Sequence, residues 1–130
     1  MKPVVILVKP QLAENIGMVA RAMKNCAISE LRLVAPKQSH TVALRASSNS
    51  EEELLNAKVY PDTQSAIADL EVVYASTARP RHQVKEVMTA EHMAKNFPHD
   101  KKVGFMFGCE RTGLENEDIA LANKIIEVPL

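Results

Sequence analysis

The sequence predicts an α/β fold with a mostly parallel sheet and helices on both of its faces. Residues 4–8 (VVILV) form an unbroken apolar run, which is typical of a strand buried on both sides in a parallel sheet. Apolar runs of strand length alternate with stretches of helical periodicity along the chain. The length of 130 residues favours one domain, which we expect to span residues 1–130.

The first half of the chain begins this alternation. A helix is expected over residues 15–27, because its apolar residues recur on one helical face at Ile16, Val19, Ala20, Met23 and Ala27. The following elements are a strand over 31–34 that ends before Pro36, a helix over 39–57 that is broken near 47–50, and a short strand at 59–60.

The second half continues in the same way. A helix is expected over 63–70, with Asp62 or Thr63 as its cap, and another over 89–96, capped by Thr89. The remaining elements are a strand over 71–76, a polar, basic loop over 77–83, a strand over 103–107, a helix over 116–123 and a strand over 125–128.

Composition excludes several classes of protein. The formal net charge is zero, so a strongly basic groove is not the main device for binding a partner. Three Phe, two Tyr and no Trp argue against an RNA binder built on aromatic stacking platforms. Cys26 and Cys109 match no metal-ligand spacing, and no signal sequence or membrane-length apolar run is present. We therefore expect a cytoplasmic protein without a metal or a membrane anchor.

Ligands of parallel α/β sheets bind beyond the carboxyl ends of the strands. Four predicted loops lie there, at residues 9–15, 35–39, 76–83 and 108–114, and a fifth is expected after Val128. The candidate functional residues are therefore sought in these loops.

Two stretches have both a functional and an ordinary interpretation. Asn15, Gly17 and Arg21 lie in and after the first helical turn, where a missing side chain allows close approach and a guanidinium can hold a phosphate. The same spacing also suits an amphipathic helix with a solvated Arg. Residues 76–81 (STARPR) leave main-chain groups free at a strand end, but they also suit a solvated loop.

The third stretch, residues 107–114 (FGCERTGL), places Gly108 and Gly113 on either side of Glu110. Two glycines so close together indicate left-handed backbone or tight contacts. The segment is not a phosphate-binding loop, because no Gly-Lys-Ser/Thr follows and an acid stands where phosphate would bind. Cys109 is interpreted as a small packed residue, and His40, His82, His92 and His99 as surface residues.

Taken together, these stretches resemble the SpoU branch of the SPOUT (α/β-knot) RNA methyltransferases. Asn15-x-Gly17-x-x-x-Arg21 is similar to the first motif of that family, and residues 107–114 through Ile126-x-Val128-Pro129 are similar to the second. The loop at residues 76–79 also matches. The likeness covers essentially the whole chain and is greatest to the TrmJ group, which methylates position 32 of the tRNA anticodon loop.

The resemblance implies S-adenosylmethionine as the methyl donor and a ribose 2′-hydroxyl of tRNA as the acceptor. It also implies a homodimer with active sites at the subunit interface. By position, the cofactor-binding residues would be Ser76, Thr77, Ala78, Gly108 and Val128, and the catalytic residues Asn15, Arg21 and Glu110.

The family proposal makes the motif arginine the base. A guanidinium holds its proton too tightly for that role, so we favour Arg21 as a clamp on the neighbouring phosphate that also stabilises the developing alkoxide. Other interpretations stay open. One alternative is an enzyme that methylates ribosomal RNA instead of tRNA. The other is a non-catalytic module for RNA binding or dimerisation.

The resemblance also implies a third motif after Pro129, Ser-Leu-Asn with a small-residue helix, which closes the cofactor pocket and forms a trefoil knot. That segment is absent from the 130 residues. We therefore expect a C-terminally incomplete domain with a defective or absent knot and weak or absent catalysis.

Overall fold

The computed structural model describes residues 2–11, 13–25, 28, 30–37, 57–77, 86–109 and 113–127. Its strands and helices follow one another as β1 (Val4–Val8), α1 (Ala13–Asn25), β2 (Glu30–Val34), β3 (Lys58–Tyr60), α3 (Thr63–Ile67), β4 (Val72–Thr77), β5 (Val87–Thr89), α4 (Ala90–Lys95), β6 (Val103–Phe107), α5 (Asn116–Leu121) and β7 (Lys124–Glu127).

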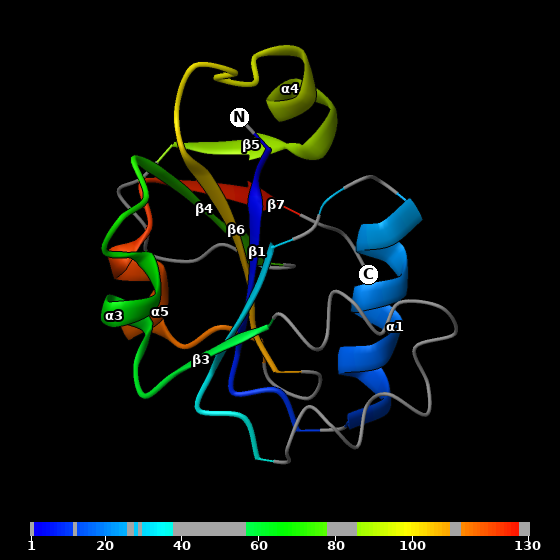
Figure 1. Cartoon of the computed structure of the whole chain (residues 1–130). Coiled ribbons are helices and arrows are strands. Elements are labelled where there is room, and N and C mark those ends of the chain that lie inside the picture. Colours follow the sequence, from blue (N-terminus) through cyan, green and yellow to red (C-terminus); the bar gives the residue numbers. More distant parts are fainter. Residues whose placement is uncertain are drawn as a thin grey trace.

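The strands form a seven-stranded sheet in the order β3-β2-β1-β6-β4-β7-β5, and every ladder is parallel (Figure 1). β1 lies inside the sheet between β2 and β6, and all five of its residues are buried. The run at residues 4–8 is apolar throughout because both faces of this strand are covered, as the sequence predicted.

Helices cover both faces of the sheet, with α3 and α5 on one side and α1 on the other, while α4 lies beside β5 (Figure 1). On the α3/α5 face, Ile6 packs in one cluster with Ala66 and Ile119. On the opposite face, α1 packs through Ile16, Ala20 and Met23 against Val5, Leu7, Leu31 and Leu33. The predicted α/β fold is confirmed.

The predicted elements differ from the observed ones mainly at their ends. α1 begins at Ala13 and ends at Asn25, and α3 ends at Ile67, three residues before its expected end. Thr77 belongs to β4 rather than to a loop. The caps are confirmed, because Asp62 accepts from the Ser65 amide and Thr89 accepts from the His92 amide.

One strand was not predicted. β5 is three residues long and alternates exposed, buried and exposed, so it carries only one buried side chain, Met88. The helix predicted over 39–57 lies outside the described residues apart from Ala57, and the expected knot and C-terminal incompleteness remain predictions. Among the described helices, none is long and apolar enough to cross a membrane.

A buried arginine joins β2 to α3. Arg32 is 2% exposed, and its guanidinium donates to the Ala66 carbonyl at 2.8 Å and to both carboxylate oxygens of Asp69 at 2.6 and 2.9 Å. Glu30 accepts two further bonds from the same group, at 2.7 and 2.9 Å. Because a buried charge without partners is costly, the satisfied guanidinium fixes α3 on its face of the sheet.

We expect Arg32→Met to lower the free energy of unfolding by about 2–4 kcal/mol, since it removes five hydrogen bonds and leaves Glu30 and Asp69 with only their exposed lysine partners, Lys58 and Lys102. Urea denaturation followed by far-UV circular dichroism measures the change. Lys95→Ala is the matched control, because Lys95 forms only an exposed pair with Glu91, and we expect at most about 0.5 kcal/mol there.

Acid should weaken this network through Asp69. Hydrogen bonds from Arg32 and then Lys102 hold the pKa of the Asp69 carboxyl well below its usual range. A carboxylate whose pKa is lowered by folding stabilises the fold above its unfolded pKa of about 4, and the contribution is lost as the pH falls from there. The difference in unfolding free energy between wild type and Asp69→Asn should shrink below pH ~4. A difference that stays constant from pH 7 to 3 would contradict this linkage.

Candidate cofactor and active site

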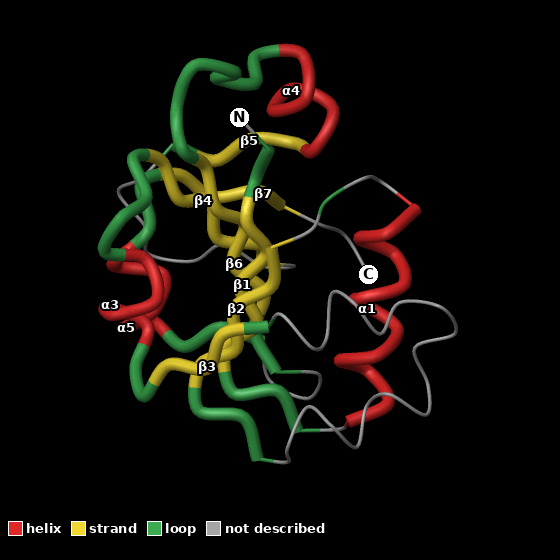
Figure 2. The backbone as a smooth tube through the Cα atoms, in the orientation of Figure 1, coloured by secondary structure: helices red, strands yellow, loops and turns green. Residues whose placement is uncertain are grey.

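Three neighbouring strands end side by side at one edge of the sheet. β4 pairs with β6 through Ala75 and Met106, and with β7 through Thr77 and Glu127. Continuing the first register by two residues places Thr77 beside Gly108, while Glu127 immediately precedes Val128. The strand bounds and the register thus bring the predicted cofactor residues Ser76, Thr77 and Gly108 to the neighbouring ends of β4 and β6, where parallel sheets hold their ligands. Figure 2 shows β4, β6 and β7 as neighbouring parts of the sheet.

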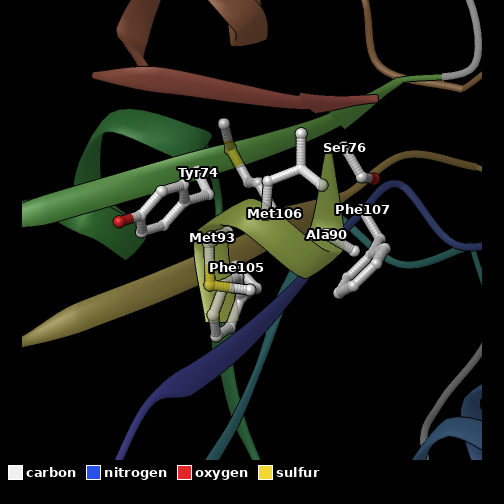
Figure 3. Close-up of a pocket in the computed structure, with 8 residues that line it drawn as sticks. Tyr74, Ser76, Ala90, Met93, Phe105, Met106 and Phe107 are labelled. Atoms are coloured by element: carbon white, nitrogen blue, oxygen red, sulfur yellow. The ribbon is translucent and has the colours of Figure 1, made fainter. Parts of the chain in front are cut away.

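A cavity of about 310 Å³ lies on the α1/α4 face of the sheet next to these strand ends (Figure 3). β4, β6 and β7 form the floor of the cavity, and α4 forms one wall. The atoms exposed to the cavity are apolar. The residues that line it are Tyr74, Ser76, Ala90, Met93, Phe105, Met106, Phe107 and Ile126. Tyr74 and Phe105 stack with ring centroids 5.5 Å apart. The volume is at the lower end of the range for small-molecule sites.

Gly108 is required by the close approach of two backbone segments. A Cβ atom at Gly108 would overlap with the carbonyl carbon of Gly113 and the amide nitrogen of Leu114. The amide of Gly113 donates to the carbonyl of Cys109 at 2.9 Å, which joins the two ends of the segment 109–113. Gly113 itself has a φ of +74°, in the left-handed region that favours glycine.

α1 brings the first predicted motif to the same face of the sheet. Gly17 is buried in this helix, and Arg21 is exposed on it one turn further on. The register places Leu7 next to Phe107, so β1, which α1 covers, is the direct neighbour of β6. Arg21 therefore lies on a helix of the same sheet face as Ser76 and Phe107, with its guanidinium available to a ligand.

The remaining predicted site residues are not tested. Ala78, Glu110 and Val128 lie outside the described residues, and for Asn15 only its place in the first turns of α1 is described. No three His, Cys, Asp or Glu side chains in the described ranges gather as metal ligands do. The sequence analysis did not identify the apolar cavity, although Ala90 and Met93 stand three residues apart on α4, as residues of one helical face do.

The parallel sheet, its row of strand ends and the adjoining cavity define an α/β protein with the arrangement in which parallel sheets hold small ligands. Comparison with known families identifies the family within this class of protein. The model of the SpoU rRNA methylase family matches residues 2–130. The chain belongs to this family, and the resemblance identified from its three motif stretches is confirmed.

Individual relatives agree with the family. The chain is 34% identical over 138 residues to LasT of Escherichia coli K12, named an uncharacterized tRNA/rRNA methyltransferase, covering 100% of this chain and 59% of LasT. It is 33% identical over 130 residues to the tRNA (cytidine-2′-O-)-methyltransferase TrmJ of Methanocaldococcus jannaschii, covering 96% of this chain and 56% of that protein.

A solved structure shows the same architecture. The crystal structure of TrmJ from Zymomonas mobilis ZM4 superposes with a TM-score of 0.92 at 46% identity, covering 100% of this chain and 60% of that one. The chain thus spans somewhat more than half the length of the relatives that it matches.

We expect Gly108→Ala to lower the free energy of unfolding by about 1–3 kcal/mol, because the added methyl group forces two backbone segments apart. Gly113→Ala is the matched control. No atom lies within 4 Å of a Cβ placed there, so its cost is the conformational one of roughly 1 kcal/mol. Relative to wild type, the amide chemical shifts of residues 107–114 should change in Gly108→Ala and stay largely the same in Gly113→Ala. Unchanged stability of Gly108→Ala would show that the close approach is not required.

Proposed function

We propose that this chain forms the methyltransferase domain of an S-adenosylmethionine-dependent enzyme that methylates a ribose 2′-hydroxyl of tRNA. The observation that carries the proposal is the convergence of the motif stretches. The ends of β4 and β6 form one edge of the sheet, and α1 presents Arg21 on the adjoining face. The relatives named TrmJ support tRNA as the substrate, and position 32 of the anticodon loop is the target that the motif resemblance suggests.

The described residues fit this methyl donor better than a nucleotide. The cavity beside Ser76 is lined by apolar atoms, which suit the adenine ring and the methylene groups of the methionine chain but would leave a polyphosphate unpaired. S-adenosylmethionine carries no phosphate. We assign donor binding to Ser76, Thr77 and Gly108, and also to Ala78 and Val128, which follow Thr77 and Glu127 in the sequence.

The chain's own part in the reaction is mainly positioning. When bound, the donor supplies a sulfonium methyl group that is already strongly electrophilic. Arg21 would hold the phosphate next to the acceptor ribose, so that the 2′-oxygen lies in line with the methyl group. Its positive charge would also stabilise the alkoxide as the proton leaves. Asn15 and Glu110 complete the proposed reaction centre.

The partners follow from the same proposal. The RNA is tRNA in the leading version, and ribosomal RNA is the alternative, which the family description names and which the name of LasT gives beside tRNA. We further propose that two copies associate as a homodimer, that the protein acts in the cytoplasm, and that the reaction needs no metal ion.

We expect the chain to bind S-adenosylmethionine in calorimetry and to transfer a tritiated methyl group to an unmodified tRNA transcript at a low rate at most, in keeping with the weak or absent catalysis expected from the sequence. Arg21→Ala should lower transfer by about ten- to a hundred-fold, the value of a charge-assisted hydrogen-bonded contact, while donor binding stays within about two-fold. Arg21→Lys should recover part of the loss, because it keeps the charge but not the two-pronged geometry.

Controls separate the alternatives. Lys95→Ala removes an exposed cation from α4 and should leave transfer unchanged. A transcript with deoxyribose at the acceptor nucleotide should receive no methyl group. Transfer to ribosomal RNA fragments but not to tRNA would support the alternative substrate, and RNA binding without donor binding would support a non-catalytic module.

A further inference from the structure

Lys9 and Ala35 end adjacent strands in the same unusual backbone conformation. Lys9 follows β1 with a φ of +51°, and its amide donates to the Val34 carbonyl at 2.8 Å. Ala35 follows β2 with a φ of +43°, and its amide donates to the Tyr60 carbonyl at 2.9 Å. Both conformations are ones that glycine would adopt at a lower cost. The two positions differ in that only Lys9 has a side chain long enough to cross to another element.

The Lys9 side chain reaches the segment after β6. Its Nζ donates to Oε1 of Glu115 at 3.3 Å, and Glu115 directly precedes α5. The hydrogen bond and the charge of Glu115 raise the pKa of the Lys9 ammonium group, with smaller contributions from the charges of Asp118 and Glu117. The pair therefore links the stretch between β1 and α1 to the stretch between β6 and α5.

A contribution to folding stability does not by itself explain why a lysine with a positive φ stands at position 9. Both partners are more than half exposed, at 53% and 56%, and ion pairs so exposed contribute little to folding. The left-handed conformation of Lys9 costs more than such a pair returns. Strained residues of this kind concentrate where a site has to be held in one geometry.

We propose that Lys9 is a positioning residue, whose ion pair with Glu115 holds the backbone of Gly113 and Leu114, which lies against Gly108, in place relative to the end of β1. The ion pair would thereby set the spacing between Gly108 and α1, the helix that carries Arg21. The consequence for methyl transfer rests on the proposed function, whereas the link between the two segments does not.

The link itself is tested without any ligand, by amide hydrogen exchange of the peptide that contains residues 108–114. Lys9→Met and Glu115→Gln should each raise its exchange rate about two- to five-fold, as expected for an exposed ion pair, and the double variant should add nothing further. Lys9→Arg should restore the wild-type rate. Salt at 1 M should remove the difference, because it screens the pair.

Lys37→Met is the matched control, because Lys37 is an exposed lysine at the end of the neighbouring strand, with its amide bonded to the Pro10 carbonyl at 3.2 Å. In the Lys37→Met variant, the amide hydrogen exchange rate of the peptide that contains residues 108–114 should equal that of wild type. Equal rates in Lys9→Met and wild type, or additive effects in the double variant, would overturn the proposal.

A second readout separates positioning from a merely structural role. Lys9→Gly and Ala35→Gly both relieve left-handed strain, so both should raise the unfolding temperature or leave it unchanged. Only Lys9→Gly should lower kcat for methyl transfer, by about two- to five-fold, with the KM for the donor unchanged. An equal kcat in the two glycine variants would overturn the catalytic part. Absence of donor binding by wild type would instead refute the proposed function and leave the exchange result standing.

Discussion

The common direction of all seven strands is the constraint on which the rest of the structure depends. Parallel strands need a connection that returns along a face of the sheet, so helices cover both faces and the inner strand β1 is buried on each. The same direction collects every strand's carboxyl end at one edge. Residues as far apart in sequence as Ala75 and Met106 become neighbours near that edge through the pairing of their strands.

The sequence was sufficient for the fold class, because the β-branched run at 4–8 and the 3.6-residue period of α1 each report a buried surface directly. It was insufficient where an element depends on distant partners. β5 buries a single side chain, so its three residues have no period to detect. Arg32 interrupts an apolar strand, and its charge is accommodated inside the protein by the carboxylates of Glu30 and of Asp69, which follows α3.

The candidate site was predictable to the extent that its residues sit at strand ends or are glycines. These two rules selected the stretches that hold Ser76, Thr77 and Gly108, whose role in binding the cofactor is implied by the family resemblance and stays a prediction. The structure supplies the reason for a glycine at position 108 in the adjacent Gly113–Leu114 backbone. Lys9 was missed because a lysine in a left-handed conformation leaves no trace in the sequence. The apolar cavity was missed for a similar reason, because its walls come from four separate elements.

The two outermost strands of the sheet, β3 and β5, are also its shortest, with three residues each. An edge strand exposes unpaired main-chain groups that can recruit a strand from another molecule, and short or charged edges oppose such recruitment. Lys58 begins one edge, and Glu86 directly precedes the other and pairs with Lys124. The sheet is thus poorly suited to open-ended growth into fibres, and an association between copies is directed to the faces and loops, where its geometry can close.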